Sequence, residues 1–106
     1  MFVMTYNITT GTLQKGEVTS VLSVNESSLY TINGNLVVSG DQPILTSNDW
    51  VNASSLHKGE LVFDPITGSF ADIYSMHHSQ ETETMYNFNI SGNNNYIAYT
   101  YLLQGV

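Results

Sequence analysis

The side chains best suited to chemistry gather in one short stretch, His77-His78-Ser79-Gln80-Glu81-Thr82-Glu83. Imidazole nitrogens and carboxylate oxygens bind zinc and other transition metals, so His77, His78 and Glu81 are candidate metal ligands. However, neighbouring residues of a strand point to opposite faces, and this stretch lies between two strand-like segments. We therefore interpret it as an exposed hairpin loop and predict neither a metal site nor a bound cofactor.

The other titratable groups are scattered. His57 lies beside Lys58 and Glu60 in a short turn, where we expect a solvated position rather than a catalytic one. Asp41 and Glu60 could pair for general acid–base catalysis, but nothing in the sequence brings them together. The chain has no cysteine, which excludes disulfides and thiolate–metal sites and leaves its redox compartment undetermined.

A hairpin at the centre of the chain is the strongest structural signal. Asn33-Gly34 stands between the apolar runs 29–32 and 36–38, and it supplies the two positive-φ residues that a type I′ turn requires. A short apolar strand at 44–46 follows, and then Trp50, the only tryptophan. A large aromatic side chain beside a turn is expected at the edge of the core.

The rest of the sequence is also typical of strands. Gly16 and the β-branched residues of the second strand favour strand over helix there, and one helical turn is predicted at 52–59, with Asn52 as N-cap and Gly59 as its end. A polar loop is expected at 25–28. Strands are predicted at 2–6, 13–24, 61–63, 70–76 and 82–90, with one buried strand in the apolar run 96–103. So many short strands predict an all-β fold, and 106 residues suit a single domain, 1–106.

Three segments of the chain resemble conserved blocks of the Hint (hedgehog/intein) superfamily. Val37-Val38-Ser39-Gly40-Asp41-Gln42-Pro43 is similar to the family's strand with its Thr-x-x-His-Pro element, and Ala53-Ser54-Ser55-Leu56-His57-Lys58-Gly59-Glu60 to its Ala-x-x-Leu-x-x-Gly-Asp tail. Met85-Tyr86-Asn87-Phe88-Asn89-Ile90-Ser91-Gly92-Asn93-Asn94-Asn95-Tyr96 resembles the last block, a tyrosine-led strand followed by Gly-x-His-Asn-Tyr. The resemblance implies an all-β, Hint-like fold of short strands and long hairpins.

The start of the chain resembles a later part of that family pattern. Val3-Met4-Thr5-Tyr6-Asn7 is similar to a Val-x-Ser-Tyr-Asp strand that lies well after the nucleophile in the family. The resemblance therefore implies an N-terminally truncated Hint-like domain that lacks the opening segment.

The same resemblance implies that the family's chemistry has been lost. In the family, an N-terminal Cys or Ser attacks the preceding carbonyl, the Thr-x-x-His element activates that bond, and a final His-Asn pair of inteins cyclises. Here Ser39 stands for the Thr, Gln42 for the first His and Asn94 for the last block's His, while Gln104-Gly105 replaces His-Asn. Side-chain amides form hydrogen bonds but do not act as acids or bases near neutral pH. Gly105 has no side chain that could cyclise. We predict that the chain is not an enzyme.

The amino-acid composition argues against some classes of binding partner. Two lysines, no arginine and nine carboxylates give a net charge of −7, which argues against binding to nucleic acid or anionic membranes. No apolar run is long enough to span a bilayer. A weakly charged surface rich in Asn, Ser, Thr and Tyr fits a subunit of a larger assembly, so we expect protein partners and no small-molecule substrate. Because domains of this family occur in phage and bacterial proteins, the resemblance points to a virion or appendage component, or to the bacterial cytoplasm.

Two alternatives stay open at this point. The chain could be the C-terminal part of a split or fragmented self-cleaving or splicing unit, with the nucleophile supplied by a partner chain. The absent opening segment favours this, and the Gln104-Gly105 ending counts against it. It could also be an unrelated β-sandwich or barrel, an adhesin-like binding module whose exposed tyrosines contact sugars or protein.

Overall fold

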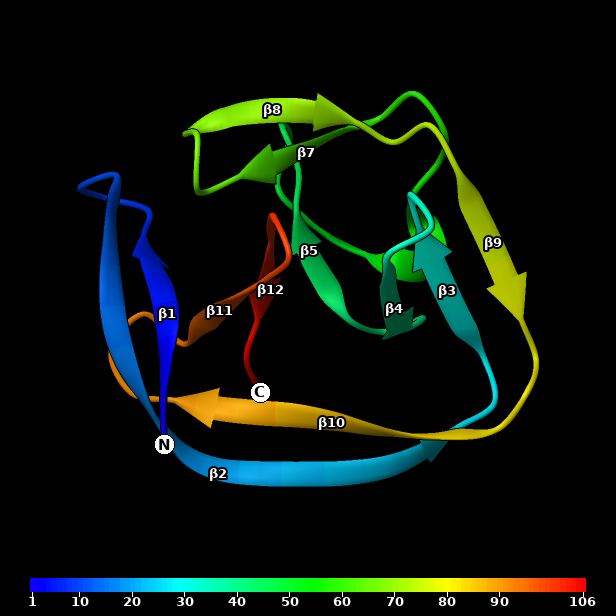
Figure 1. Cartoon of the computed structure of the whole chain (residues 1–106), viewed down its shortest axis with the longest axis horizontal. Helices are drawn as coiled ribbons and strands as arrows, with labels where there is room; N and C mark the ends of the chain where they lie inside the picture. Colours follow the sequence, from blue (N-terminus) through cyan, green and yellow to red (C-terminus); the bar gives the residue numbers. More distant parts are fainter.

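The computed structural model describes all 106 residues as an all-β chain with one short 3₁₀ helix and no helix with the length and apolar character needed to cross a membrane. Figure 1 labels its elements. In chain order they are β1 (Phe2–Asn7), β2 (Thr12–Glu26), β3 (Leu29–Ile32), β4 (Leu36–Ser39), β5 (Pro43–Leu45), β6 (Trp50–Asn52), η1 (Ala53–Ser55), β7 (Leu61–Asp64), β8 (Ser69–Asp72), β9 (Met76–Ser79), β10 (Glu83–Ile90), β11 (Asn95–Ala98) and β12 (Tyr101–Gln104).

The strands form four small sheets, and the first of them contains the long β2–β10 ribbon. Their orders are β1-β2-β10, β11-β12-β5-β6, β4-β3-β9 and β7-β8. The fifteen-residue β2 pairs with β1 through its first half and with β10 through its second half. In Figure 1 the β2–β10 ribbon runs along the base of the molecule, and the C-terminus lies next to it.

A glycine lets β2 serve both partners. A Cβ atom on Gly16 would lie 2.5 Å from Thr5 Cγ2 and 2.7 Å from Ile90 Cγ2, closer than carbon atoms approach without displacement. Thr5 belongs to β1 and Ile90 to β10, so the absence of a side chain at this position allows the two strands to close on β2 from the same side. The pairing of β2 with β10 also shifts register between Asn89 and Ile90.

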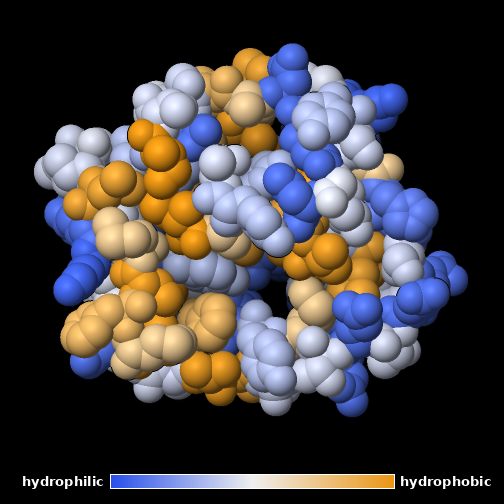
Figure 2. All heavy atoms as spheres, in the orientation of Figure 1, coloured by the Kyte–Doolittle hydropathy of each residue, from blue (hydrophilic) through white to orange (hydrophobic).

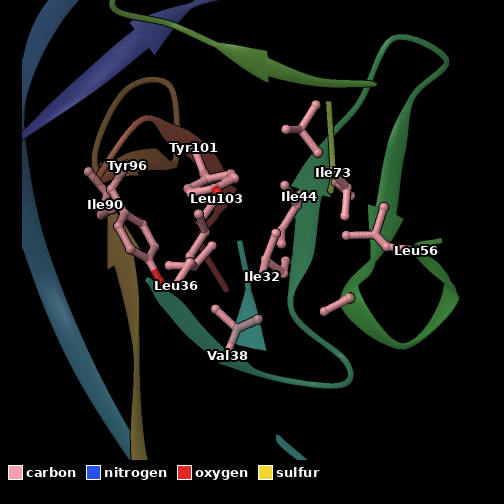
Figure 3. Packing of buried hydrophobic residues seen from close by; sticks show 12 residues of the cluster. Ile32, Leu36, Val38, Ile44, Leu56, Ile73, Ile90, Tyr96, Tyr101 and Leu103 are labelled. Carbon is pink, nitrogen blue, oxygen red and sulfur yellow. The ribbon is translucent and has the colours of Figure 1, made fainter. Parts of the chain in front are cut away.

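The core is one cluster drawn from most of the sheets. Figure 3 shows side chains from β3, β4, β5, β11 and β12 pointing toward one another, joined by Leu56, which follows η1, and by Ile73, which follows β8. The cluster consists of Ile32, Leu36, Val38, Ile44, Ala53, Leu56, Val62, Ile73, Ile90, Tyr96, Tyr101 and Leu103. Packing between sheets, rather than the face of any one sheet, therefore holds the fold together.

The central hairpin has the predicted geometry. Asn33 (φ 53°) and Gly34 (φ 71°) both take positive φ between β3 and β4, which confirms the prediction from the Asn-Gly pair. Asn33 Nδ2 also donates to the Tyr101 hydroxyl at 3.1 Å, and that hydroxyl donates to Asn35 Oδ1 at 3.3 Å. The turn is thus tied to β12. Trp50 is partly buried in β6 and lies outside the core cluster, as expected of an edge position.

Other local predictions need correction. The run 96–103 is not one strand but the β11–β12 hairpin, in which Tyr99 (φ 55°) takes the positive-φ conformation without a Gly, Pro or Asn signal. The predicted helical turn shrinks to Ala53–Ser55, and the Asn52 side chain makes no cap hydrogen bond. The polar loop at 25–28 is also shorter, because pairing with β10 extends β2 as far as Glu26.

The prediction of one strand at 70–76 followed by a loop is also wrong. The chain leaves the β7–β8 hairpin at Asp72 and joins β3 as a separate strand, β9, from Met76 to Ser79. His77 and His78 therefore lie in a strand, paired opposite Thr31 and Tyr30, and not in a hairpin loop. The change of sheet depends on the long-range pairing with β3, which has no local signal.

Candidate functional site

An open cleft of about 270 Å³ separates the β2–β10 ribbon from β4. Most of its lining is apolar, with Leu22 and Val24 from β2, Met85 from β10, and Val38 and Leu103 from the core side. In Figure 2 a hollow opens on this face above the ribbon. Two carboxylates line the cleft, and no lysine, arginine or histidine does.

Gln42 braces the polar end of this cleft. Its side chain is only 5% exposed, and its Nε2 donates to the backbone oxygens of Pro43 and Gln104, both at 2.9 Å. The Gln42 backbone also holds the surrounding turn, because its N–H donates to the Ser39 carbonyl at 3.1 Å and its carbonyl accepts from the Ala53 N–H at 3.0 Å. Both donor hydrogens of the amide are therefore used to join the start of β5 to the end of β12.

Ser39 lies at the same end of the cleft, at the end of β4. Its hydroxyl donates to Asp41 Oδ1 at 2.8 Å, across the tight turn at Gly40. This short-range bond holds the turn and leaves the Asp41 carboxylate at the rim of the cleft. Asp41 and Glu60 have different hydrogen-bond partners, because Glu60 Oε1 accepts from the His57 N–H at 2.8 Å.

Asn94 anchors the C-terminal residues. It takes a positive φ of 49°, its Oδ1 accepts from the Ile90 N–H at 2.9 Å, and its Nδ2 donates to the Val106 carbonyl oxygen at 3.1 Å. Asn89 Nδ2 donates to the same Val106 oxygen at 2.6 Å. Two amides thus converge on one carbonyl, and the Val106 side chain lines the cleft.

Gly105 fits tightly into this arrangement. Its N–H donates to the Asn94 carbonyl at 2.8 Å. A Cβ atom at position 105 would collide with Asn94 Oδ1 and would lie 2.7 Å from the Phe88 carbonyl oxygen. Any side chain at this position would therefore require a shift of the Asn94 side chain together with either the Phe88 carbonyl or the C-terminal residues.

The candidate positions meet around one cleft. Ser39 and Gln42 line it, Gln104 reaches it through the carbonyl that Gln42 binds, and Asn94 reaches it through Val106. This juxtaposition joins two segments more than fifty residues apart in the sequence. As a set, these groups can donate and accept hydrogen bonds. None of the four amide and hydroxyl side chains has a pKa near neutral pH.

Tyr96 forms part of the cleft wall. It packs edge-on against Phe88, with ring centroids 5.2 Å apart, and burial raises the pKa of its hydroxyl to about 12. The group therefore remains protonated across the physiological range, and it supplies a neutral hydroxyl to an otherwise apolar wall.

The histidine stretch lies apart from this cleft. The His78 ring stacks on Tyr30 at 4.5 Å and 7°, and its Nε2 lies 3.0 Å from Ser28 Oγ. Glu81 is exposed, and its N–H donates to Ser79 Oγ at 3.2 Å. No group of three or more His, Cys, Asp or Glu residues is placed to hold a metal ion. His57 is exposed, as expected.

No protein-family model and no curated protein matches the sequence. The structure, however, superimposes on solved inteins over almost its whole length. The Ssp DnaB mini-intein variant M86 matches with a TM-score of 0.83 at 15% identity, covering 99% of this chain and 76% of that one. The bacterial intein-like domain from Clostridium thermocellum gives 0.83 at 19% identity, with 99% and 80% covered. The DnaB intein from Synechocystis sp. PCC 6803 gives 0.81 at 15%, with 99% and 78% covered.

The chain has the Hint (hedgehog/intein) fold. The fold class predicted from the sequence blocks is thereby confirmed, and the alternative of an unrelated β-sandwich or barrel is wrong. Because the chain spans 76 to 80% of these three solved chains, the expected truncation of the Hint domain is compatible with the comparison.

The sequence alone does not predict every residue that forms the cleft. The roles of Val106 and Asn89 and the apolar wall from β2 depend on strand pairings that only the structure shows. One signal was available for the wall. Leu22, Val24 and Glu26 recur at every second position, which places them on one face of a strand.

Proposed function

We propose that this Hint-fold chain does not process itself and serves as a structural or interaction module within a larger protein assembly. The observation that carries the proposal is the state of Gln42. Its buried amide is held between the Pro43 and Gln104 carbonyls, at the position where the family resemblance expects a proton-exchanging histidine. An amide in this place braces the fold and transfers no proton near neutral pH.

The C-terminal residues support the same proposal. The resemblance places the cyclising asparagine of inteins at position 105, where this chain has a glycine packed against Asn94 and the Phe88 carbonyl. The neighbouring amides of Asn89 and Asn94 hold the Val106 carbonyl. The Ser39 hydroxyl, which lines the same cleft, donates to Asp41 Oδ1 and so helps to hold the turn at Gly40.

The surface favours a protein partner. An apolar cleft is open to solvent on one face, and several large apolar side chains that line it are exposed, including Leu22, Val24 and Tyr86. Exposed apolar groups of this kind mark interaction sites. Only Lys15 and Lys58 carry positive charge against nine carboxylates, so nucleic acid and anionic membranes are poor partners. A phage virion or appendage is the assembly we propose.

Intact-mass measurement tests the absence of self-processing. The chain is expressed with its natural flanking sequences and incubated for several days, beside an active DnaB mini-intein as positive control. We expect the mini-intein to process and this chain to keep its full mass. Time-dependent cleavage at either boundary, in purified protein without added enzymes, would overturn the proposal.

A second candidate is the C-terminal part of a split self-processing unit. The observation in its favour is the open cleft beside Ser39 and Gln42, which has room for a segment from another chain. Mixing the chain with candidate N-terminal fragments should then produce a new peptide bond, visible as a change in mass. Unchanged masses for all fragments would remove this candidate and leave the first.

A further inference from the structure

The β4 strand presents an edge, not a face, to the cleft. All four of its residues, Leu36 to Ser39, line the cleft, although alternation would place only every second residue on one face. On its other side β4 pairs with β3, its only neighbour in the sheet. The Ser39 carbonyl accepts from the Gln42 N–H at 3.1 Å. The other backbone groups of β4 that point away from β3 have no neighbouring strand and can pair with an additional one.

The opposite wall is an apolar strand face. Leu22 and Val24 lie two residues apart on β2, and Val24 is paired with Met85 and Leu22 with Asn87 across the ribbon. All four line the cleft. Leu22 is 52% exposed and Val24 is 41% exposed, so covering them would remove apolar surface from water. A strand seated here would have its backbone on β4 and alternate side chains on this wall.

The chain's own end shows what this cleft accepts. The Val106 N–H donates to the Phe88 carbonyl on β10 at 2.8 Å, and the Val106 side chain lines the cleft. An aliphatic residue, bound through its backbone N–H, is thus already seated at one end of the cleft. The remaining space of about 270 Å³ lies just below the usual range of roughly 300–1,000 Å³ for small-molecule pockets, and it suits a few aliphatic side chains.

The negative charge around the cleft favours some partner segments over others. Glu26 and Asp41 are the charged residues that line the cleft, and both are acidic. A segment flanked by lysine or arginine would complement them, whereas one flanked by carboxylates would be repelled.

We propose that the cleft receives an extended, apolar segment of a partner protein, flanked by basic residues, which adds a strand to the open edge of β4. The inference rests on the proposed interaction function and specifies its partner. Backbone hydrogen bonds to β4 would supply affinity, and the pocket formed with Leu22 and Val24 would select alternate aliphatic side chains.

A displayed library of random octapeptides, selected on the purified full chain, tests this. We expect enriched sequences with aliphatic residues at every second position, a flanking lysine or arginine and no central proline. Leu22→Asp should weaken binding of an enriched peptide by about tenfold or more, since it removes one apolar contact. The matched control is Val21→Asp, because Val21 is equally exposed at 54%, belongs to the same strand and does not line the cleft. It should change binding less than about twofold.

The rim charge gives a second readout. In Glu26→Lys, binding of the basic-flanked peptide should weaken, and the same peptide with glutamate flanks should gain affinity. The inference is overturned if no peptide is enriched, if Leu22→Asp and Val21→Asp act alike, or if the chain forms a dimer that Leu22→Asp dissociates, because a second copy would then fill the cleft. Self-cleavage would overturn the proposed function instead, whatever the library shows.

Discussion

Removing the Gln42 amide is the sharpest test of the bracing role assigned to it. In Gln42→Ala the Pro43 and Gln104 carbonyls each lose a donor held at 2.9 Å in a site that is 5% exposed. Two net hydrogen bonds are worth about 1–3 kcal/mol together, and the lost methylene adds about 0.8 kcal/mol. We therefore expect the free energy of unfolding to fall by about 2–4 kcal/mol.

Urea denaturation followed by the fluorescence of Trp50, the only tryptophan, measures this loss. Gln42→Glu provides a matched control of nearly equal size. Its carboxylate can only accept, so at neutral pH it faces two carbonyl oxygens without a donor, and in acid the protonated group regains one O–H donor. At pH 7, Gln42→Glu should therefore lose more unfolding free energy than Gln42→Ala, each measured against wild type. At pH 4, Gln42→Glu should regain part of that loss. A loss below about 0.5 kcal/mol for Gln42→Ala would refute the bracing role.

Three further predictions concern Gly105, Gly34 and Tyr96. Gly105→Ala should lower the free energy of unfolding by about 1–3 kcal/mol, because the added Cβ lies 2.7 Å from the Phe88 oxygen; unchanged urea midpoints would contradict this. Gly34→Val should cost about 1–2 kcal/mol for its positive φ, whereas Gly34→Asn should cost less; equal losses would show that backbone conformation is not the cause. Burial raises the pKa of Tyr96 to about 12 in the folded chain, whereas an unfolded tyrosine ionises near pH 10. The contribution of Tyr96 to the free energy of unfolding is therefore complete below pH 10 and falls by about 2–3 kcal/mol between pH 10 and pH 12. Tyr96→Phe should flatten this fall, and an unchanged slope in alkaline urea titrations would exclude Tyr96 as its source.

The part of the fold that could be predicted is the part with local signals. Asn33-Gly34 imposes its own turn, and the strands near 2–7 and 83–90 carry β-branched and aromatic residues between polar breaks. The β11–β12 hairpin was missed because Tyr99 adopts positive φ only under the pairing of Ala98 with Tyr101. Similarly, the residues of β9 have no strand pattern of their own, and their pairing with β3 decides their conformation.

In the candidate site, too, only the residues that belong to local motifs could be predicted. Ser39, Gln42 and Asn94 could be placed from the sequence blocks that resemble the Hint family, because a short motif keeps its spacing when individual side chains in it are replaced. The cleft could not be foreseen, because its walls come from β2, β4 and β10 and its polar end depends on a bond between Gln42 and Gln104, 62 residues apart. Loop closures of that length leave no periodic trace in a sequence.

At position 42 the side-chain amide makes two donor hydrogen bonds, which a neutral imidazole cannot do. Gln42 uses two N–H donors on two carbonyls, and Asn94 uses one acceptor and one donor to join the Ile90 N–H to the Val106 carbonyl. A neutral imidazole has a single N–H, so a histidine at position 42 would leave one buried carbonyl without its donor, at a cost of about 1–3 kcal/mol. Gln42→His would therefore weaken the tie between β5 and β12, so a histidine at this position could not brace the two strands as well as Gln42 does.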